Sequence, residues 1–479
     1  MKSYTAVLLA LVLASVSTAG RAAGHPAIAV SSLEFGPFGT VTLYQTAPHP
    51  RRIVLFASGD GGWKLGVVDM ARALATQDAL VAGFNTVHYL HALEHGAGPC
   101  AYAAADLENL SQYLQKRAGR AHYTQPVLAG YSSGATLVYV ALAQAPPNTF
   151  RGGLSLGFGP ELPVTKPFCR GAGLRSTPGS KHKGYRFIPG RALAAPWAVL
   201  QGTIDKVASP AATESFVAKV PGARLIVLQK VGHGYSVPRH WIPQFYAAFQ
   251  SVAQVPVAPR TATDADLKGL PLVEVPAAKD TGDTLGVVIS GDGGWAGIDR
   301  QLAEQLAAEG IPVVGLDSLQ YFWNRRTPDG AALDLARILN HYLTRWHRQK
   351  VILIGYSRGA DVLPFMTDRL PPELLRRITV VALLGPSPTV DFEFHLTDWL
   401  HNGSDTAHYA VLPQVEKLHG PRVLCFYGVA ERDSLCRKLD PARYGIVEMP
   451  GGHHFDGRYR AIADRILATA QATPVRSAD

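Results

Sequence analysis

Short apolar runs alternate along the chain with segments in which apolar residues recur every three or four positions. Runs such as Arg52–Ser58, Leu285–Ser290 and Lys350–Ile354 are typical of buried strands, because they are apolar, rich in β-branched residues and close to glycine-rich turns. Ile298–Glu309 and Leu333–Trp346 have the spacing of amphipathic helices. Apolar strands separated by helices favour a mostly parallel sheet with helices on both faces, which is an α/β fold.

Three motifs occur twice, in the same order and at nearly constant spacing. The pairs are Ser58–Trp63 and Ser290–Trp295, Gly130–Ala135 and Gly355–Ala360, and Gly232–His233 and Gly452–His453. This repetition indicates a duplicated domain. We predict a first α/β domain over residues 24–250, a linker over 251–268 that is rich in Ala, Val, Pro and Thr, and a second α/β domain over 269–479.

The N-terminus has the three-part pattern of a signal peptide. Lys2 precedes the apolar run Ala6–Val16, and small residues follow up to Ala22. The run is shorter than the roughly 20 residues that a spanning helix needs, which disfavours the alternative of a membrane anchor. We expect residues 1–23 to be cleaved and the protein to be exported to the periplasm.

Four cysteines are consistent with an exported protein. We expect two disulfides, Cys100–Cys169 and Cys425–Cys436, because an even count outside the cytosol favours pairing. Four separate buried thiols are the alternative. His453 and His454 have no third ligand at zinc spacing, so we expect no metal, and no motif calls for a cofactor.

Composition narrows the class of protein. With 479 residues, 47% apolar and 17% charged, the chain can bury a core in each domain. Its net charge of +9 falls to +7 when Lys2 and Arg21 leave with the signal peptide, and a positive surface suits an anionic partner. Because Lys and Arg are scattered and the protein is predicted to be exported, we expect that partner to be a membrane surface and not a nucleic acid.

Each domain carries a candidate serine nucleophile. Ser132 and Ser357 lie in G-x-S-x-G motifs, each between a predicted strand and a predicted helix. That context is typical of the nucleophile elbow of α/β hydrolases, so we predict two tandem α/β-hydrolase-like domains.

The oxyanion hole needs two backbone donors. One is the amide that follows the nucleophile, from Ser133 or Arg358. The other comes from the glycine-rich loop after an earlier strand, for which we choose two pairs of neighbouring residues. They are Asp60 and Gly61 in the first domain, and Asp292 and Gly293 in the second. A tight glycine turn without a catalytic role is the alternative for these loops.

The acid and the histidine follow the nucleophile in this fold. In the first domain they are Asp205 and His233. In the second we choose Asp433 over Glu431 as the acid. We choose His453 over His454 because Gly-His-x-aromatic then aligns in both copies.

These motifs carry a resemblance to a known family. Gly355–Phe365 (GYSRGADVLPF), with Ser290–Trp295 before it and Pro450–Gly457 after it, resembles the bacterial virulence protein family VirJ, and the two-copy arrangement is similar to its longer relative AcvB. The likeness is strongest over residues 283–470. It implies a periplasmic hydrolase that cleaves lysyl-phosphatidylglycerol and is linked to type IV secretion and virulence, with Ser357 as nucleophile and His453 and Asp433 as its partners.

The implied substrate is cationic, so its site should contain an acid. Asp361 lies one helical turn after Ser357 and is our candidate for binding the substrate amine, with a helix cap or a core hydrogen bond as the equal alternative. The expected partners are aminoacylated phosphatidylglycerol at the membrane surface and components of a secretion system. A periplasmic scaffold or adaptor with an inactive hydrolase fold is the competing interpretation.

Overall fold

The computed structural model describes residues 27–96, 99–179, 184–190, 193–254, 267–277, 279, 282–394 and 409–472. The predicted signal peptide lies outside the described residues, as does most of the predicted linker. Among the described helices, none combines the length and the apolar character needed to cross a bilayer.

The first domain is built on an eight-stranded sheet. Its strands, in spatial order, are β1 (Ala29–Glu34), β2 (Thr40–Gln45), β4 (Ala79–Phe84), β3 (Arg52–Ala57), β5 (Val127–Tyr131), β6 (Gly152–Leu156), β10 (Trp197–Gly202) and β11 (Arg224–Leu228). The pairs β1–β2 and β2–β4 are antiparallel and the rest are parallel. The domain also contains a separate small sheet, whose strands in spatial order are β7 (Glu161–Leu162), β9 (Tyr185–Ile188) and β8 (Arg175–Pro178).

Helices cover both faces of this sheet, as predicted. Helices α1 (Gly66–Ala75) and α6 (Ile242–Ala253) pack on one face, and α2 (Thr86–His95), α3 (Ala103–Arg117), α4 (Ser133–Gln144) and α5 (Pro210–Val217) pack on the other. In α1 the buried residues Val67, Met70, Ala71 and Leu74 follow the spacing of one helix face.

The second domain repeats this architecture with a seven-stranded sheet. Its order is β12 (Leu272–Val275), β14 (Val313–Leu316), β13 (Thr284–Ile289), β15 (Lys350–Tyr356), β16 (Ile378–Leu384), β19 (Arg422–Gly428) and β20 (Gly445–Met449). Only the β12–β14 pair is antiparallel within this sheet. The order matches that of the first sheet without a counterpart of β1, and a separate pair, β17 (Thr389–Val390) and β18 (Tyr409–Ala410), lies outside it.

The second sheet is also covered on both faces. Helices α7 (Gly297–Ala308) and α13 (Tyr459–Gln471) pack on one face. The other face holds α8 (Ser318–Tyr321), α9 (Pro328–Arg345), α10 (Arg358–Thr367), α11 (Pro372–Leu375) and α12 (Leu412–Glu416). Helix α9 begins earlier than predicted, because Pro328 occupies its first turn and the Thr327 hydroxyl accepts a hydrogen bond from the Gly330 amide.

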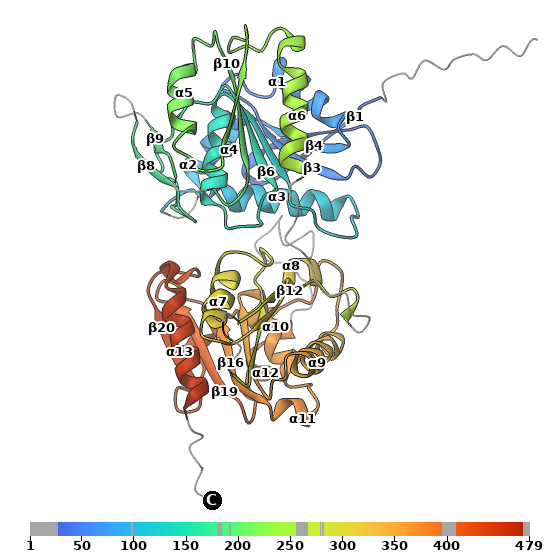
Figure 1. The fold of residues 1–479 in the computed structure, drawn as a ribbon, viewed down its shortest axis with the longest axis vertical. Coiled ribbons are helices and arrows are strands. Elements are labelled where there is room, and N and C mark those ends of the chain that lie inside the picture. Colours follow the sequence, from blue (N-terminus) through green and yellow to red (C-terminus); the bar gives the residue numbers. More distant parts are fainter. Residues whose placement is uncertain are drawn as a thin grey trace, which may run out of the picture.

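The two domains meet between α3 and the loops that follow β13 and β14 (Figure 1). The Trp323 indole donates to the Arg120 carbonyl at 2.7 Å, and the Asn148 amide donates to the Trp295 carbonyl at 3.0 Å. Tyr123 of the first domain packs on Trp323 and joins the core of the second. The first domain therefore covers part of the edge at which the parallel strands of the second sheet end.

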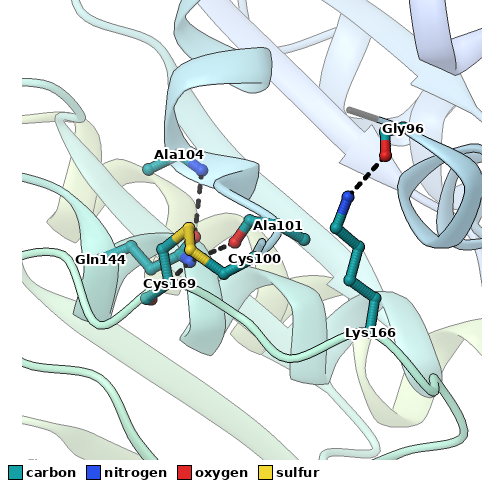
Figure 2. Close-up of a disulfide and its surroundings, with 7 residues drawn as sticks. All are labelled: Gly96, Cys100, Ala101, Ala104, Gln144, Lys166 and Cys169. Carbon is teal, nitrogen blue, oxygen red and sulfur yellow. Dashed lines mark hydrogen bonds between the residues drawn. A yellow bond between two sulfur atoms is a disulfide. The ribbon is translucent and has the colours of Figure 1, made fainter. Parts of the chain in front are cut away.

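A disulfide fixes the start of α3, the helix that faces the second domain. Cys100 and Cys169 are bonded, as predicted, and Cys100 lies three residues before the first residue of the helix (Figure 2). The buried Gln144 side chain accepts from the Ala104 amide and donates to the carbonyls of Ala101 and Cys169. These contacts tie α3 to α4, the helix that begins at the first nucleophile elbow.

Candidate active site

Both predicted nucleophiles lie at sharp turns between a strand and a helix. Ser132 joins β5 to α4 with φ 56°, and Ser357 joins β15 to α10 with φ 52°. A positive φ is strained for a residue with a side chain, and such strain persists only where the surrounding structure holds it. Each serine stands immediately before a helix, whose first amides have no partner inside the helix.

The glycines of each motif allow this turn. A Cβ on Gly134 would collide with the backbone of Ala57, and one on Gly359 would collide with the backbone of Ile289. The helix therefore approaches the neighbouring strand as closely as backbone atoms permit. This close packing is the physical reason for the G-x-S-x-G pattern in both copies.

The first domain contains a connected Ser–His–Asp arrangement. His233 Nε2 lies 3.0 Å from Ser132 Oγ, and His233 Nδ1 lies 2.8 Å from Asp205 Oδ2. The Asp205 side chain is fully buried, and its other oxygen accepts from the amides of Val207 and Ala208. A carboxylate held in this way fixes the imidazole so that Nε2 can accept the serine proton.

In the second domain the acid differs from the predicted one. His453 Nδ1 lies 2.5 Å from Glu431 Oε1, while the other Glu431 oxygen accepts from the Gly428 amide at 2.6 Å. Asp433, which we predicted, is exposed and is not the carboxylate that contacts the histidine. Burial alone would raise the pKa of Glu431, but the hydrogen bonds from His453 and Gly428 bring it below its ordinary value.

The turn after β19 explains this correction. The Glu431 amide donates to the Gly428 carbonyl, so the chain turns back at once and points Glu431 inward. Asp433 lies two residues further along the chain, after the turn, and its side chain is exposed. The predicted Cys425–Cys436 disulfide closes the loop that carries this acid, which ties the loop to β19.

His453, which we chose, is the histidine that contacts Glu431, whereas His454 has another contact. The catalytic role of His453 stays a prediction. The Tyr356 hydroxyl lies 3.0 Å from His454 Nδ1, and burial lowers the pKa of His454. Among the described residues no hydrogen bond joins Ser357 to His453, in contrast to the first site. Apo sites often have such loose contacts, which tighten when substrate binds.

A tyrosine before each nucleophile supports the histidine loop. The Tyr131 hydroxyl donates to the His233 carbonyl at 2.8 Å, and the Tyr356 hydroxyl donates to the His453 carbonyl at 3.3 Å. The two tyrosine–histidine ring distances, 5.3 and 5.2 Å, are almost the same in the two domains. We did not single out these tyrosines from the sequence, although their occurrence in both motifs was a signal.

The predicted oxyanion loops lie against the nucleophiles. A Cβ on Gly59 would lie 3.0 Å from the Ser132 Cβ, and one on Gly291 would lie 3.2 Å from the Ser357 Cβ. Gly59 and Gly291, which make these contacts, each lie one residue before the predicted pair. The predicted pairs are Asp60 and Gly61 in the first domain, and Asp292 and Gly293 in the second. The donor roles of these amides, and those of Ser133 and Arg358, stay predictions.

Arg358 has a structural contact that Ser133, its counterpart, lacks. Its guanidinium donates to Asp292 Oδ1 at 2.5 Å and to the Asp391 carbonyl at 2.8 Å, and it stacks over the Phe394 ring. This side chain ties the glycine-rich loop of the second domain to the segment after β17.

Asp361 has a hydrogen bond in the core of the second domain. It is buried, and its Oδ1 accepts from the Ser387 amide at 2.6 Å. Burial raises the pKa of Asp361 well above its usual range. These contacts match the core hydrogen bond that was the alternative to our prediction of amine binding. In the described part of the chain, no group of three or more His, Cys, Asp or Glu residues could hold a metal ion.

The chain is similar at low sequence identity to several solved structures. A serine hydrolase without a lid from Xanthomonas campestris is 19% identical, with a TM-score of 0.32, over 48% of this chain and 97% of its own. An esterase domain from Rhodothermus marinus is 14% identical, with a TM-score of 0.31, over 47% and 98%. A puromycin-hydrolyzing peptidase from Mycobacterium tuberculosis is 17% identical, with a TM-score of 0.34, over 49% and 40%.

No curated protein sequence matches the chain. The family model of the bacterial virulence protein VirJ matches residues 51–151 and 283–473, which together make up more than half of the chain. The matched segments include both nucleophile elbows and the acid and histidine of the second domain. The chain therefore belongs to the VirJ family of bacterial virulence proteins.

Proposed function

We propose that this protein is a periplasmic serine hydrolase that cleaves the aminoacyl ester of lysyl-phosphatidylglycerol, releasing lysine and phosphatidylglycerol. The observation that carries the hydrolase assignment is the contact chain from Ser132 through His233 to Asp205, at a strained strand–helix turn. The choice of lipid rests on the resemblance to the VirJ family, and so does the proposed link to virulence and type IV secretion.

The first site has the groups that ester hydrolysis requires. Ser132 Oγ attacks the ester carbonyl carbon while His233 Nε2 takes the hydroxyl proton, and Asp205 stabilises the charged imidazole. Amides at the start of α4 and in the glycine-rich loop stabilise the oxyanion. The glycerol hydroxyl of phosphatidylglycerol leaves with the proton from His233. Water then attacks the lysyl-enzyme, with His233 again as base, and lysine leaves.

The second site performs the same reaction with Ser357, His453 and Glu431. The family match runs through almost the whole second domain, which supports this assignment. The reaction requires the Ser357 hydroxyl to reach His453, and we expect this contact to form when substrate binds. The two disulfides support export to the periplasm, because such bonds persist in oxidising compartments.

The test is lysine release from vesicles that contain lysyl-phosphatidylglycerol. We expect release by the full chain, partial loss in Ser132→Ala or Ser357→Ala, and complete loss in the double variant. Loss in one single variant alone would assign the chemistry to that domain. Full activity of the double variant would overturn the serine mechanism. A wild-type chain that hydrolyses no ester would favour the periplasmic scaffold.

A further inference from the structure

Exposed apolar side chains surround the catalytic edge of the first domain. Leu65 is 81% exposed, Ile204 is 60% exposed and Val237 is 40% exposed. They lie in the loops after β3, β10 and β11, three strands that share one direction with β5, which ends at Ser132. Because parallel strands end at the same edge, these side chains lie on the side of the sheet that carries the triad. We call Leu65, Ile204, Val207 and Val237 the apolar rim.

Leu65 is held outward against its backbone preference. Its φ of 56° lies in the region that glycine adopts and that side chains disfavour. The corresponding residue of the second domain is Gly297, which has no side chain to present. The side chain of Leu65 buries little of its surface against the fold around it. It is therefore available for an interaction outside the chain.

Cations are interleaved with the apolar rim. Lys64 precedes Leu65, Lys206 lies between Ile204 and Val207, Lys230 begins the histidine loop, and Arg239 follows Val237; all four are exposed. None of these cations forms an ion pair with a residue that the structure describes. The three loops comprise residues 58–65, 203–209 and 229–240. They contain two acidic residues, of which Asp60 is exposed and Asp205 is buried.

The second domain provides an internal contrast. Its corresponding loop is covered by the first domain, because Pro146 lies against Gly297 and Asn148 donates to the Trp295 carbonyl. The same edge of the same fold is thus partly covered in one copy. In the other copy, exposed apolar and cationic side chains occupy it.

We propose that the apolar rim and its cations dock the first domain onto an anionic phospholipid bilayer, with Ser132 facing the lipid. Apolar tips that enter the headgroup region, together with cations at the same depth, are the pattern of peripheral membrane binding. The proposal extends the proposed function, since a lipid ester must reach the nucleophile from the bilayer surface. A protein partner would also cover apolar residues, but the excess of cations in these loops favours an anionic surface.

The test measures binding separately from hydrolysis. Full-length protein is floated with vesicles of phosphatidylglycerol and phosphatidylcholine in equal parts, and with phosphatidylcholine alone. One variant removes apolar tips by Leu65→Gly, Ile204→Ser and Val237→Ser; a second removes charge by Lys64→Gln, Lys230→Gln and Arg239→Gln. Leu333→Ser and Val227→Ser, which alter exposed apolar residues elsewhere, form the matched control.

We expect wild type and control to bind the anionic vesicles equally. The apolar variant should bind at least about tenfold more weakly, and the charge variant should lose its preference for phosphatidylglycerol and its sensitivity to salt. Both rim variants should still hydrolyse a water-soluble ester. Wild-type failure to bind vesicles, or unchanged binding by the rim variants, would overturn the proposal. Ser132→Ala should bind like wild type, so a failed hydrolase assignment would leave this result standing.

Discussion

Glu431 Oε1 lies 2.5 Å from His453 Nδ1, whereas Asp433 is exposed on the same loop. This contact makes Glu431 the candidate acid of the second site. In a Ser132→Ala background, which isolates that site, we expect Glu431→Gln to lower kcat by about 10⁴-fold, because the imidazole loses its orienting charge. Asp433→Asn is the matched control and should keep full activity. The reverse ranking in an ester assay would refute the assignment.

Tyr131 holds the histidine loop through its hydrogen bond to the His233 carbonyl. In a Ser357→Ala background, we expect Tyr131→Phe to lower kcat about tenfold with little change in KM, because the imidazole shifts while substrate contacts remain. The free energy of unfolding should fall by about 1 kcal/mol. Tyr246→Phe, which removes a hydroxyl near Thr76, controls for loss of a hydroxyl. A KM effect without a kcat effect would contradict a positioning role.

The sequence predicted the parts of the fold that depend on local pattern. The two nucleophile elbows follow from glycines that allow close backbone packing, and the parallel strands follow from continuous apolar runs. The antiparallel strands β1, β2 and β12 had no comparable signal, because they are short or partly exposed.

The positions of several side chains could not be predicted from the sequence, because they depend on how the chain folds around them. The choice between Glu431 and Asp433 depended on the position at which the chain reverses after β19. The motif contains both carboxylates and does not show which of them the turn directs toward the histidine. Asp361 was assigned to the substrate by helical spacing, but only the packing of the chain near Ser387 shows that it is buried. The packing of α3 against the second domain involves Glu108, which belongs to no recognisable motif.

Glu108 on α3 reaches the glycine-rich loop of the second domain. Its Oε1 is buried without a hydrogen-bond partner among the described residues, and a Cβ on Gly293 would lie 3.7 Å from it. Burial, with the charge of Asp292, raises the pKa of Glu108 from 4.5 to about 8. In the packed state the Glu108 carboxyl therefore stays protonated up to a pH of about 8, whereas in the separated or unfolded state it loses its proton above a pH of about 4.5.

This difference predicts that stability falls as pH rises between about 4.5 and 8 and levels off above that window. The slope from Glu108 is at most about 1.4 kcal/mol per pH unit. Glu108→Gln should remove this contribution, whereas Glu214→Gln, an exposed change on α5, should not. Melting temperatures at several pH values measure it, and an unchanged slope in Glu108→Gln would contradict the buried carboxyl.

The Cys100–Cys169 disulfide should contribute more stability than Cys425–Cys436. The sequence separations are 69 and 11 residues, and the loss of entropy in the unfolded chain grows with the length of the closed loop. We expect paired Cys→Ser changes to cost about 4 and about 3 kcal/mol respectively. Denaturant unfolding of the two double variants tests this order. A larger loss of unfolding free energy on removal of Cys425–Cys436 would contradict the predicted dependence on loop length.

We infer that His233 activates Ser132 as a nucleophile. A fluorophosphonate, which reacts with activated serines, followed by peptide mass spectrometry tests it most directly. We expect a covalent adduct on Ser132 in the wild-type chain and in Ser357→Ala, with the rate of labelling falling by orders of magnitude in His233→Ala. An unlabelled Ser132, or labelling that is equally fast without His233, would contradict it.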